Sequence, residues 1–128
     1  MDNPQILVVD DQEMLQVALR RVLERSGLRV LTAGSGAEAL AVLEKTPVPM
    51  VISDLRMPGL SGIELLAQVK QRWPSTLRLV LTAEFDQALM AAISSCDVHR
   101  CIAKPWNNEV LTTLVKHLLA QFQTANAG

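Results

Sequence analysis

Short apolar runs alternate with amphipathic stretches along most of the chain. The five runs are Ile6–Val9, Leu28–Ala33, Met50–Ser53, Leu77–Thr82 and His99–Ala103. Each run is only a few residues long, and most are rich in Val, Ile or Leu, which is typical of strands rather than of buried helices. We therefore predict five β-strands at these positions.

The segments between the runs carry apolar residues at the three- and four-residue spacing of an α-helix. The three clearest stripes are Leu15, Ala18, Leu19, Val22 and Leu23; Leu89, Ala92, Ile93 and Cys96; and Leu111, Leu114, Val115, Leu118 and Leu119. Two further segments, Ser35–Lys45 and Gly62–Trp73, are also interpreted as helices. Strands and helices that alternate in this way predict a parallel sheet with helices on both faces.

The composition of the runs also predicts their order in the sheet. The first, third and fourth runs are continuously apolar, as expected for strands that are covered on both faces. The second run is interrupted by Arg29, and the fifth by His99 and Arg100, so these two are expected at the edges. We therefore predict a doubly wound, flavodoxin-like α/β fold with five strands in the order 2-1-3-4-5, which has its ligand site at the carboxyl ends of the strands.

Length, charge and cysteine content narrow the class of protein. A chain of 128 residues with 49 % hydrophobic and 20 % charged residues suits one globular domain. A net charge of -1 gives no support for a nucleic-acid or membrane surface. The segment "MDNPQ" lacks the features of a signal peptide, so we expect a cytoplasmic protein. Cys96 and Cys101 are too few for a disulfide framework or a zinc site.

Polar residues follow four of the predicted strands directly. Asp10 and Asp11 come after the first strand and Asp54 after the third, while Thr82 ends the fourth and Lys104 follows the fifth. Because the strands are predicted to be parallel, these ends share one edge of the sheet. We therefore expect three carboxylates, a hydroxyl and an ammonium group to converge on one cleft.

Such a set of side chains indicates metal-assisted phosphoryl chemistry. Three crowded carboxylates raise one another's pKa unless a cation lies between them, and oxygen ligands suit Mg²⁺. A metal ion, a hydroxyl and a lysine can neutralise a phosphoryl group in transfer, and a carboxylate can be its acceptor. Two alternatives stay open: Asp10 and Asp11 as the cap and first-turn acid of a helix, and Asp54 as a turn residue before Pro58-Gly59.

Four motifs in order resemble one known family. "VVDD", "SDLRMPGLSG", "LTAE" and "AKPW" are similar to the motifs of receiver domains in bacterial two-component response regulators. The resemblance covers about residues 5–122. It predicts a response regulatory (receiver) domain over residues 4–122, followed by a tail or linker over residues 123–128.

The resemblance implies roles for the acidic residues. Asp54 would accept a phosphoryl group from a sensor histidine kinase, a phosphotransfer protein or a small phosphodonor. Asp11 and Asp54 would bind Mg²⁺ (or Mn²⁺) directly, with the backbone carbonyl of Arg56 as a further ligand. Asp10 would act largely through water.

The resemblance also implies roles for residues around the phosphoryl group. Thr82 would donate a hydrogen bond to it, Lys104 would form an ion pair with it, and the peptide bond between Lys104 and Pro105 would be cis. Cys101 stands where many receivers carry an aromatic switch residue, so a switch based on an aromatic rotamer is not expected in this chain.

Arg56 and Glu84 lie two residues after Asp54 and Thr82, at positions that in the family flank the path of the hydrolytic water. We hypothesise that Arg56 and Glu84 form an ion pair that slows hydrolysis. Arg56→Ala should then shorten the phosphoryl lifetime.

The predicted protein is a signalling switch rather than an enzyme, with self-phosphorylation and its reversal as its only chemistry. Phosphorylation would bias residues 82–95, the fifth strand and the last helix, and so control an output domain, a partner or a homodimer. Two other functions stay open. One is an Mg²⁺-dependent phosphohydrolase or phosphotransferase that forms an aspartyl-phosphate, and the other is a pseudo-receiver that only binds a partner.

Overall fold

The computed structural model describes residues 4–55, 57, 59–83, 87, 90, 91, 94 and 98–127, with the backbone alone for 122–127. Its helices and strands follow one another in the alternating order that the sequence predicts. They are β1 (Ile6–Val9), α1 (Glu13–Arg25), β2 (Val30–Ala33), α2 (Gly36–Lys45), β3 (Met50–Ser53), α3 (Gly62–Arg72), β4 (Leu77–Thr82), β5 (Arg100–Ala103) and α5 (Asn108–Ala127). The predicted stripe Leu89, Ala92, Ile93 and Cys96 lies outside the described residues.

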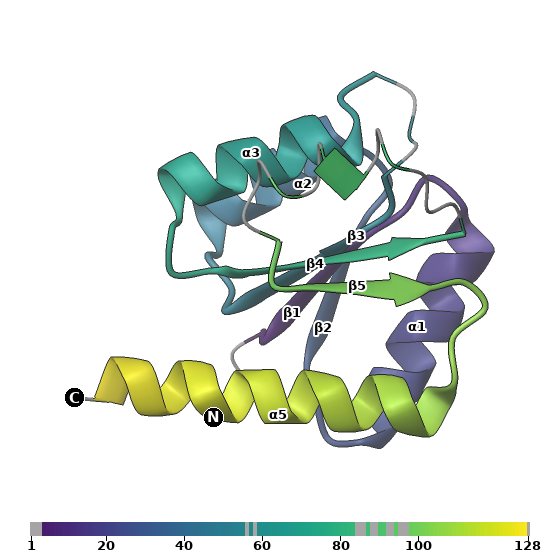
Figure 1. Ribbon diagram of the computed structural model, residues 1–128, viewed down its shortest axis with the longest axis vertical. Coiled ribbons are helices and arrows are strands. Elements are labelled where there is room, and N and C mark those ends of the chain that lie inside the picture. Colours follow the sequence, from purple (N-terminus) through teal and green to yellow (C-terminus); the bar gives the residue numbers. More distant parts are fainter. Residues whose placement is uncertain are drawn as a thin grey trace.

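The strands form one parallel sheet in the order β2-β1-β3-β4-β5 (Figure 1). Val9 at the end of β1 lies opposite both Ala33 and Ser53, the last residues of the neighbouring strands. The predicted strand order is therefore confirmed, with the two polar-interrupted strands at the edges. The register also aligns the carboxyl ends of β1 and β3, so the residues that follow them begin side by side.

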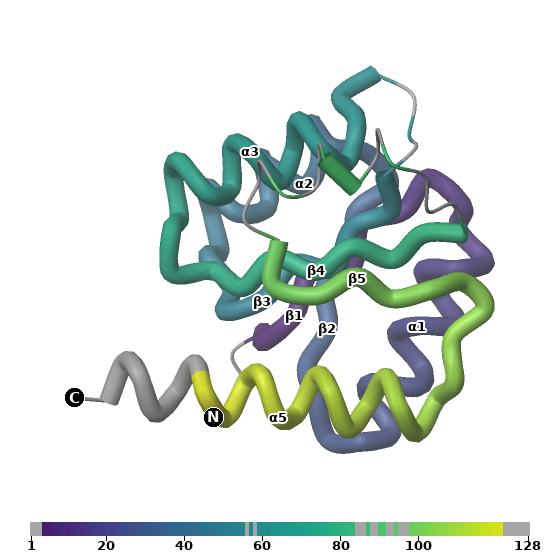
Figure 2. The backbone as a smooth tube through the Cα atoms, in the orientation of Figure 1, coloured from purple at the N-terminus to yellow at the C-terminus, as the bar shows by residue number. Residues whose placement is uncertain are grey.

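Two layers of helices cover the sheet. Helices α2 and α3 lie on one face, and α1 and α5 lie on the other (Figures 1 and 2). Alternate residues of β1 belong to the two cores: Leu7 and Val9 pack on the α2 and α3 side, and Ile6 and Val8 on the α1 and α5 side. Because β1 and β3 are buried along their whole length, they have the continuous apolar sequence expected of central strands.

Local signals in the sequence set where the helices begin and end. Ser61 and Glu64 form a capping box at the start of α3, in which each side chain bonds the other residue's backbone N–H. Gly27 follows the end of α1 with φ +89°, a left-handed conformation that glycine adopts without steric cost. These two signals thus fix the start of α3 and the end of α1.

The last helix is longer than the sequence analysis suggests. Helix α5 continues through Ala127, into residues 123–128 that we interpreted as a tail or linker. Neither Gly nor Pro occurs in this helix before Gly128, so nothing in its composition stops it earlier. The boundary of the domain itself stays a prediction.

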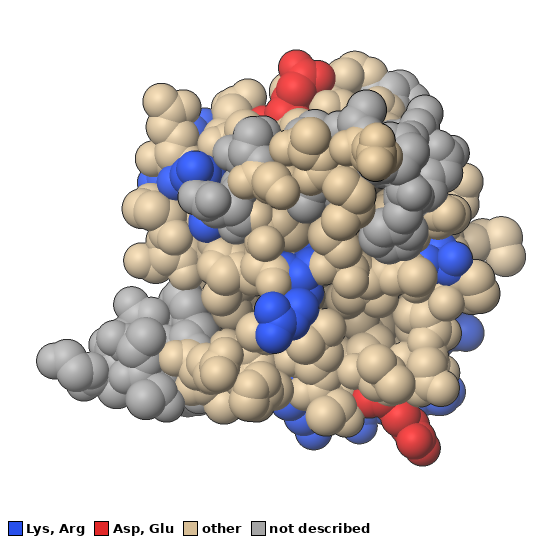
Figure 3. Space-filling view, viewed as in Figure 1, with Lys and Arg blue, Asp and Glu red and all other residues tan. Residues whose placement is uncertain are grey.

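Charged side chains are mixed with neutral ones on the surface. On the face shown in Figure 3, the basic and acidic side chains of the described residues are scattered rather than gathered into one patch, in keeping with the net charge of -1. None of the helices in the described residues is long and apolar enough to cross a membrane.

Candidate functional site at the carboxyl ends of the strands

The sheet itself positions the two acids that follow its central strands. The backbone N–H of Asp10 donates to the carbonyl of Ala33 at 3.1 Å, and that of Asp54 donates to the carbonyl of Val9 at 3.0 Å. Each aspartate thus continues the ladder by one residue beyond the end of its strand. The two carboxylates are brought together by strand register rather than by loop conformation.

Asp11 completes a cluster of three carboxylates. One oxygen from each of Asp10, Asp11 and Asp54 lies within 4.8 Å of the others. Asp10 is buried, Asp54 is half-buried and Asp11 is exposed. The convergence of the three acids that the sequence predicts is therefore confirmed.

Among the described residues, Lys104 is the side chain that forms ion pairs with this cluster. Its ammonium nitrogen Nζ lies 3.0 Å from Oδ2 of Asp10 and 3.3 Å from Oδ2 of Asp54. Its backbone N–H donates to the carbonyl of Thr82 at 2.9 Å and so extends the pairing of β4 with β5. The peptide bond between Lys104 and Pro105 is cis, as the resemblance implies. Within the described residues, three acids and one base leave the cluster with excess negative charge.

The protonation of Asp54 reflects these neighbours. Burial raises the pKa of the Asp54 carboxyl, the charge of Lys104 lowers it, and the charge of Asp10 raises it again, with a net result above the ordinary value. The backbone N–H of Leu55 donates to Oδ1 of Asp54 at 2.8 Å and favours the ionised form. A cation placed among the acids would oppose this rise, because it stabilises the ionised carboxylate.

The donor set fits Mg²⁺. Carboxylate oxygens are its preferred protein ligands, and it keeps several waters. The three oxygens are near enough for one ion to be held by two of them directly and by the third directly or through water. Asp10 also accepts a hydrogen bond from Lys104, and its indirect role stays a prediction of the resemblance.

Comparison with known proteins identifies the family. The family model described as the response regulator receiver domain matches residues 6–116. The chain belongs to this receiver-domain family. It is thus the receiver domain of a two-component response regulator, a family of signalling switches.

Individual relatives agree with the family. The hydrogenase transcriptional regulatory protein HoxA of Cupriavidus necator is 40 % identical over 112 residues, which are 87 % of this chain and 23 % of HoxA. The DNA-binding transcriptional regulator NtrC of Escherichia coli is 34 % identical over 120 residues, which are 92 % of this chain and 25 % of NtrC. The receiver domain thus spans about a quarter of the length of these curated relatives.

A solved structure is similar over almost the whole receiver domain. It is the signal receiver domain of an HD domain-containing protein from Pseudomonas fluorescens, which is 30 % identical with a TM-score of 0.91. The match covers 99 % of this chain and 94 % of that one.

The other predicted site residues differ in their burial, and two of them lie outside the described residues. Thr82 is buried at the end of β4, and Cys101 is half-buried on β5. Cys101 packs against the core on the α2 and α3 side, and burial raises the pKa of its thiol. Pro105 is exposed. Arg56 and Glu84, including the proposed carbonyl ligand and ion pair, lie outside the described residues.

The capping interpretation of the paired aspartates does not hold. The N-cap of α1 is Gln12, whose side chain makes no capping hydrogen bond. Instead, Oδ1 of Asp10 accepts from the backbone N–H of Gln12 at 2.9 Å. Asp10 therefore organises the turn between β1 and α1, three residues before the helix begins at Glu13.

Two residues that the sequence analysis missed lie against the Asp54 backbone. The hydroxyl of Ser53 donates to the Asp54 carbonyl at 2.7 Å. A Cβ atom added to Gly62 would lie 2.0 Å from the same carbonyl oxygen, so only glycine allows this approach of α3. The "SG" that begins α3 was the available signal, but a sequence does not show which backbone a glycine will meet.

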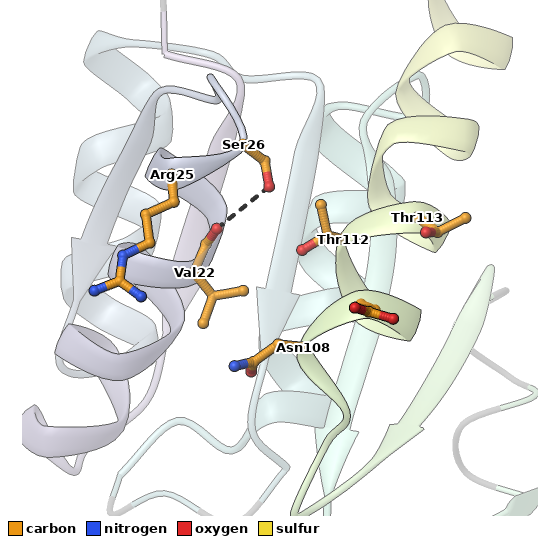
Figure 4. Close-up of a pocket in the computed structure, with 7 residues that line it drawn as sticks. Val22, Arg25, Ser26, Asn108, Thr112 and Thr113 are labelled. Carbon is orange, nitrogen blue, oxygen red and sulfur yellow. Dashed lines mark hydrogen bonds between the residues drawn. The ribbon is translucent and has the colours of Figure 1, made fainter.

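Two of the hollows in the described part of the chain lie between α1 and residues of the C-terminal part of the domain. One, of about 560 Å³, is lined by residues of α1 and of the link from β5 to α5, including Lys104, Pro105 and Trp106. The other, of about 410 Å³, lies between α1 and the start of α5, with Val22, Arg25 and Thr112 among its lining residues (Figure 4). Neither is lined by any of the three aspartates, although Lys104, which pairs with two of them, lines the first.

Proposed function

We propose that this receiver domain accepts a phosphoryl group on Asp54 in an Mg²⁺-dependent reaction and acts in the cytoplasm as a phosphorylation switch. The observation that carries the proposal is the joint placement of Asp10, Asp11, Asp54 and Lys104 at one edge of the sheet. Among these acids, Asp54 is the only one that is both half-buried and paired with Lys104. It is therefore partly shielded from water and yet open to a phosphodonor.

The chemistry needs one nucleophile and one leaving group. A carboxylate oxygen of Asp54 attacks the phosphorus atom of the donor, and a new O–P bond forms as the bond to the leaving group breaks. The leaving group, a histidine imidazole or a carboxylate such as acetate, departs with the bonding electrons. Attack of water on the phosphorus later releases inorganic phosphate and restores the Asp54 carboxylate.

Residues around Asp54 support this transfer. The Leu55 N–H orients one oxygen of the carboxylate, and Lys104 lies 3.3 Å from the other, where it can pair with phosphoryl oxygens. Thr82 ends the neighbouring strand and would donate its hydroxyl to the phosphoryl group. When bound by Asp11 and Asp54, Mg²⁺ would supply the positive charge that neutralises the transferred oxygens.

Phosphorylation would change the charge balance that Lys104 now maintains. A phosphoryl group adds about -1.5 to -2 charges, so Lys104 would exchange part of its contact with Asp10 for the new group. Because the Lys104 backbone pairs with that of Thr82, movement of Lys104 would also displace the ends of β4 and β5. We propose that β5, residues 82–95 and α5 carry the change to a partner.

The relatives indicate the kind of partner. HoxA is a transcriptional regulatory protein and NtrC a DNA-binding transcriptional regulator, and the matched part is a fraction of each. We propose a sensor histidine kinase or phosphotransfer protein as the phosphodonor and an output domain as the responder. A phosphorylation-dependent homodimer stays a further prediction.

One experiment tests the proposal. The purified domain is incubated with acetyl phosphate and Mg²⁺, and its intact mass is measured with and without a chelator. We expect one added phosphoryl group that is absent with the chelator and in Asp54→Asn. No labelling of the wild-type protein would favour the pseudo-receiver, and rapid turnover of varied phosphate esters would favour a phosphohydrolase.

A further inference from the structure

The carboxylate of Asp11 lies near two like charges. It is exposed, and within the described part of the chain no hydrogen bond or ion pair holds it. Even so, one of its oxygens lies within 4.8 Å of those of Asp10 and Asp54. Repulsion would turn this side chain away, so the backbone that carries it must set its direction.

The peptide between Asp10 and Asp11 is fixed by hydrogen bonds to Asp10. The Asp10 N–H bonds the sheet at Ala33, and its Oδ1 accepts from the Gln12 N–H. The carbonyl oxygen of this peptide accepts from Nε2 of Gln16 at 2.7 Å. Among the described residues, Gln16 provides the one recorded side-chain contact to that carbonyl.

The position of Gln16 on α1 directs its side chain toward the sheet. It lies on α1 three residues before Leu19 and seven before Leu23, both fully buried. It therefore continues the buried stripe of the helix with a polar side chain. The side chain is half-buried, and its Nε2 would lie 3.6 Å from a Cβ atom placed on Gly34, so the amide lies beside the link after β2.

We infer that Gln16 is a positioning residue for the metal site: by holding the Asp10 carbonyl, it aims the Asp11 carboxylate at the acidic cluster. The inference rests on the proposed function, because it concerns Mg²⁺ at the same cluster. Groups that orient metal ligands change metal affinity by about 10- to 100-fold when they are removed. Loss of the Gln16 amide should therefore weaken Mg²⁺ binding while every carboxylate remains.

The test substitutes methionine, which keeps the length and helix propensity of glutamine but cannot donate a hydrogen bond. Mg²⁺ binding to the intact domain is titrated calorimetrically for wild type, Gln16→Met and the matched control Gln71→Met, whose glutamine is exposed on α3. Circular dichroism without metal confirms folding, and Gln16→Ala replaces Gln16→Met if that variant fails to fold. Labelling by acetyl phosphate is then measured across Mg²⁺ concentrations.

The expected result is a Kd for Mg²⁺ about tenfold higher in Gln16→Met and unchanged in Gln71→Met. The labelling rate should return to the wild-type value at saturating Mg²⁺, because Asp54 and Lys104 are intact. A rise in Kd of less than about threefold would overturn the inference, as would a labelling rate that stays low at saturating Mg²⁺. If wild type neither binds Mg²⁺ nor is labelled, the proposed function fails instead.

Discussion

Replacing Lys104 by methionine should destabilise the metal-free domain by about 3 kcal/mol. The Lys104 ammonium lies 3.0 Å from Asp10 and 3.3 Å from Asp54, which gives an attraction of about 5 kcal/mol to each at an effective dielectric constant near 20. Desolvation of all three groups offsets much of this gain. The net loss in the variant therefore comes from leaving Asp10 charged with only 2 % of its side chain exposed. Removing one partner of a buried ion pair costs about 3–5 kcal/mol of unfolding free energy. The lower end applies because 16 % of the Lys104 side chain is exposed.

Urea denaturation in the presence of a chelator at neutral pH measures this loss. With an m-value of about 1–3 kcal/mol per molar urea, the midpoint should fall by at least about 1 M. Lys116→Met is the matched control, since Lys116 is exposed on α5, and its midpoint should not change. Adding Asp10→Asn to the Lys104 variant should recover part of the loss, because the uncompensated charge is removed. A loss below about 1 kcal/mol for Lys104→Met would refute the charge-balance argument.

Three further predictions follow from the same site. Because the pKa of Asp54 is raised, the folded, metal-free domain holds this proton more tightly than the unfolded chain does, and its stability falls as pH rises through that pKa. Asp54→Asn should therefore raise the melting temperature at neutral pH without Mg²⁺, by an amount that vanishes toward pH 3. An equal gain at both pH values would contradict this. Gly62→Ala should lower the unfolding free energy by about 1–3 kcal/mol and slow the labelling of Asp54. The control is Gly34→Ala, whose Cβ would lie 3.5 Å or more from its neighbours. This variant should keep both the unfolding free energy and the labelling rate of the wild type. Mg²⁺ at 100 times its Kd should stabilise the wild-type domain by about 2.7 kcal/mol in a thermal melt. Asp11→Ala should remove this gain in stability while keeping the fold. If the gain in the variant equals that of the wild type, Asp11 is not a ligand.

Strand order and the acidic cluster were predictable because each depends on a strong local signal. Apolar runs without a polar interruption identify β1, β3 and β4, and the register of a parallel sheet then brings Asp10 and Asp54 together. An acid that directly follows each of two such runs can therefore be placed at the carboxyl edge of the sheet from the sequence alone.

Contacts between a helix and the end of the strand before it were not predictable. The Gln16 amide meets the Asp10 carbonyl only because α1 packs back on the sheet, and Gly62 meets the Asp54 carbonyl only because α3 crosses above it. The C-terminal end of α5 was also missed, since "QTANAG" has weak signals for either a helix or a tail. For Gln16 and Gly62, tertiary packing decides what local sequence leaves open.

The most direct test of the account is to locate the phosphoryl group. The wild-type domain is labelled with acetyl phosphate and Mg²⁺, the acyl phosphate is reduced with borohydride, and the modified residue is identified by peptide mass spectrometry. The account predicts conversion of Asp54 alone, with Asp10 and Asp11 unchanged. Modification at another residue, or labelling that persists without a divalent cation, would contradict it.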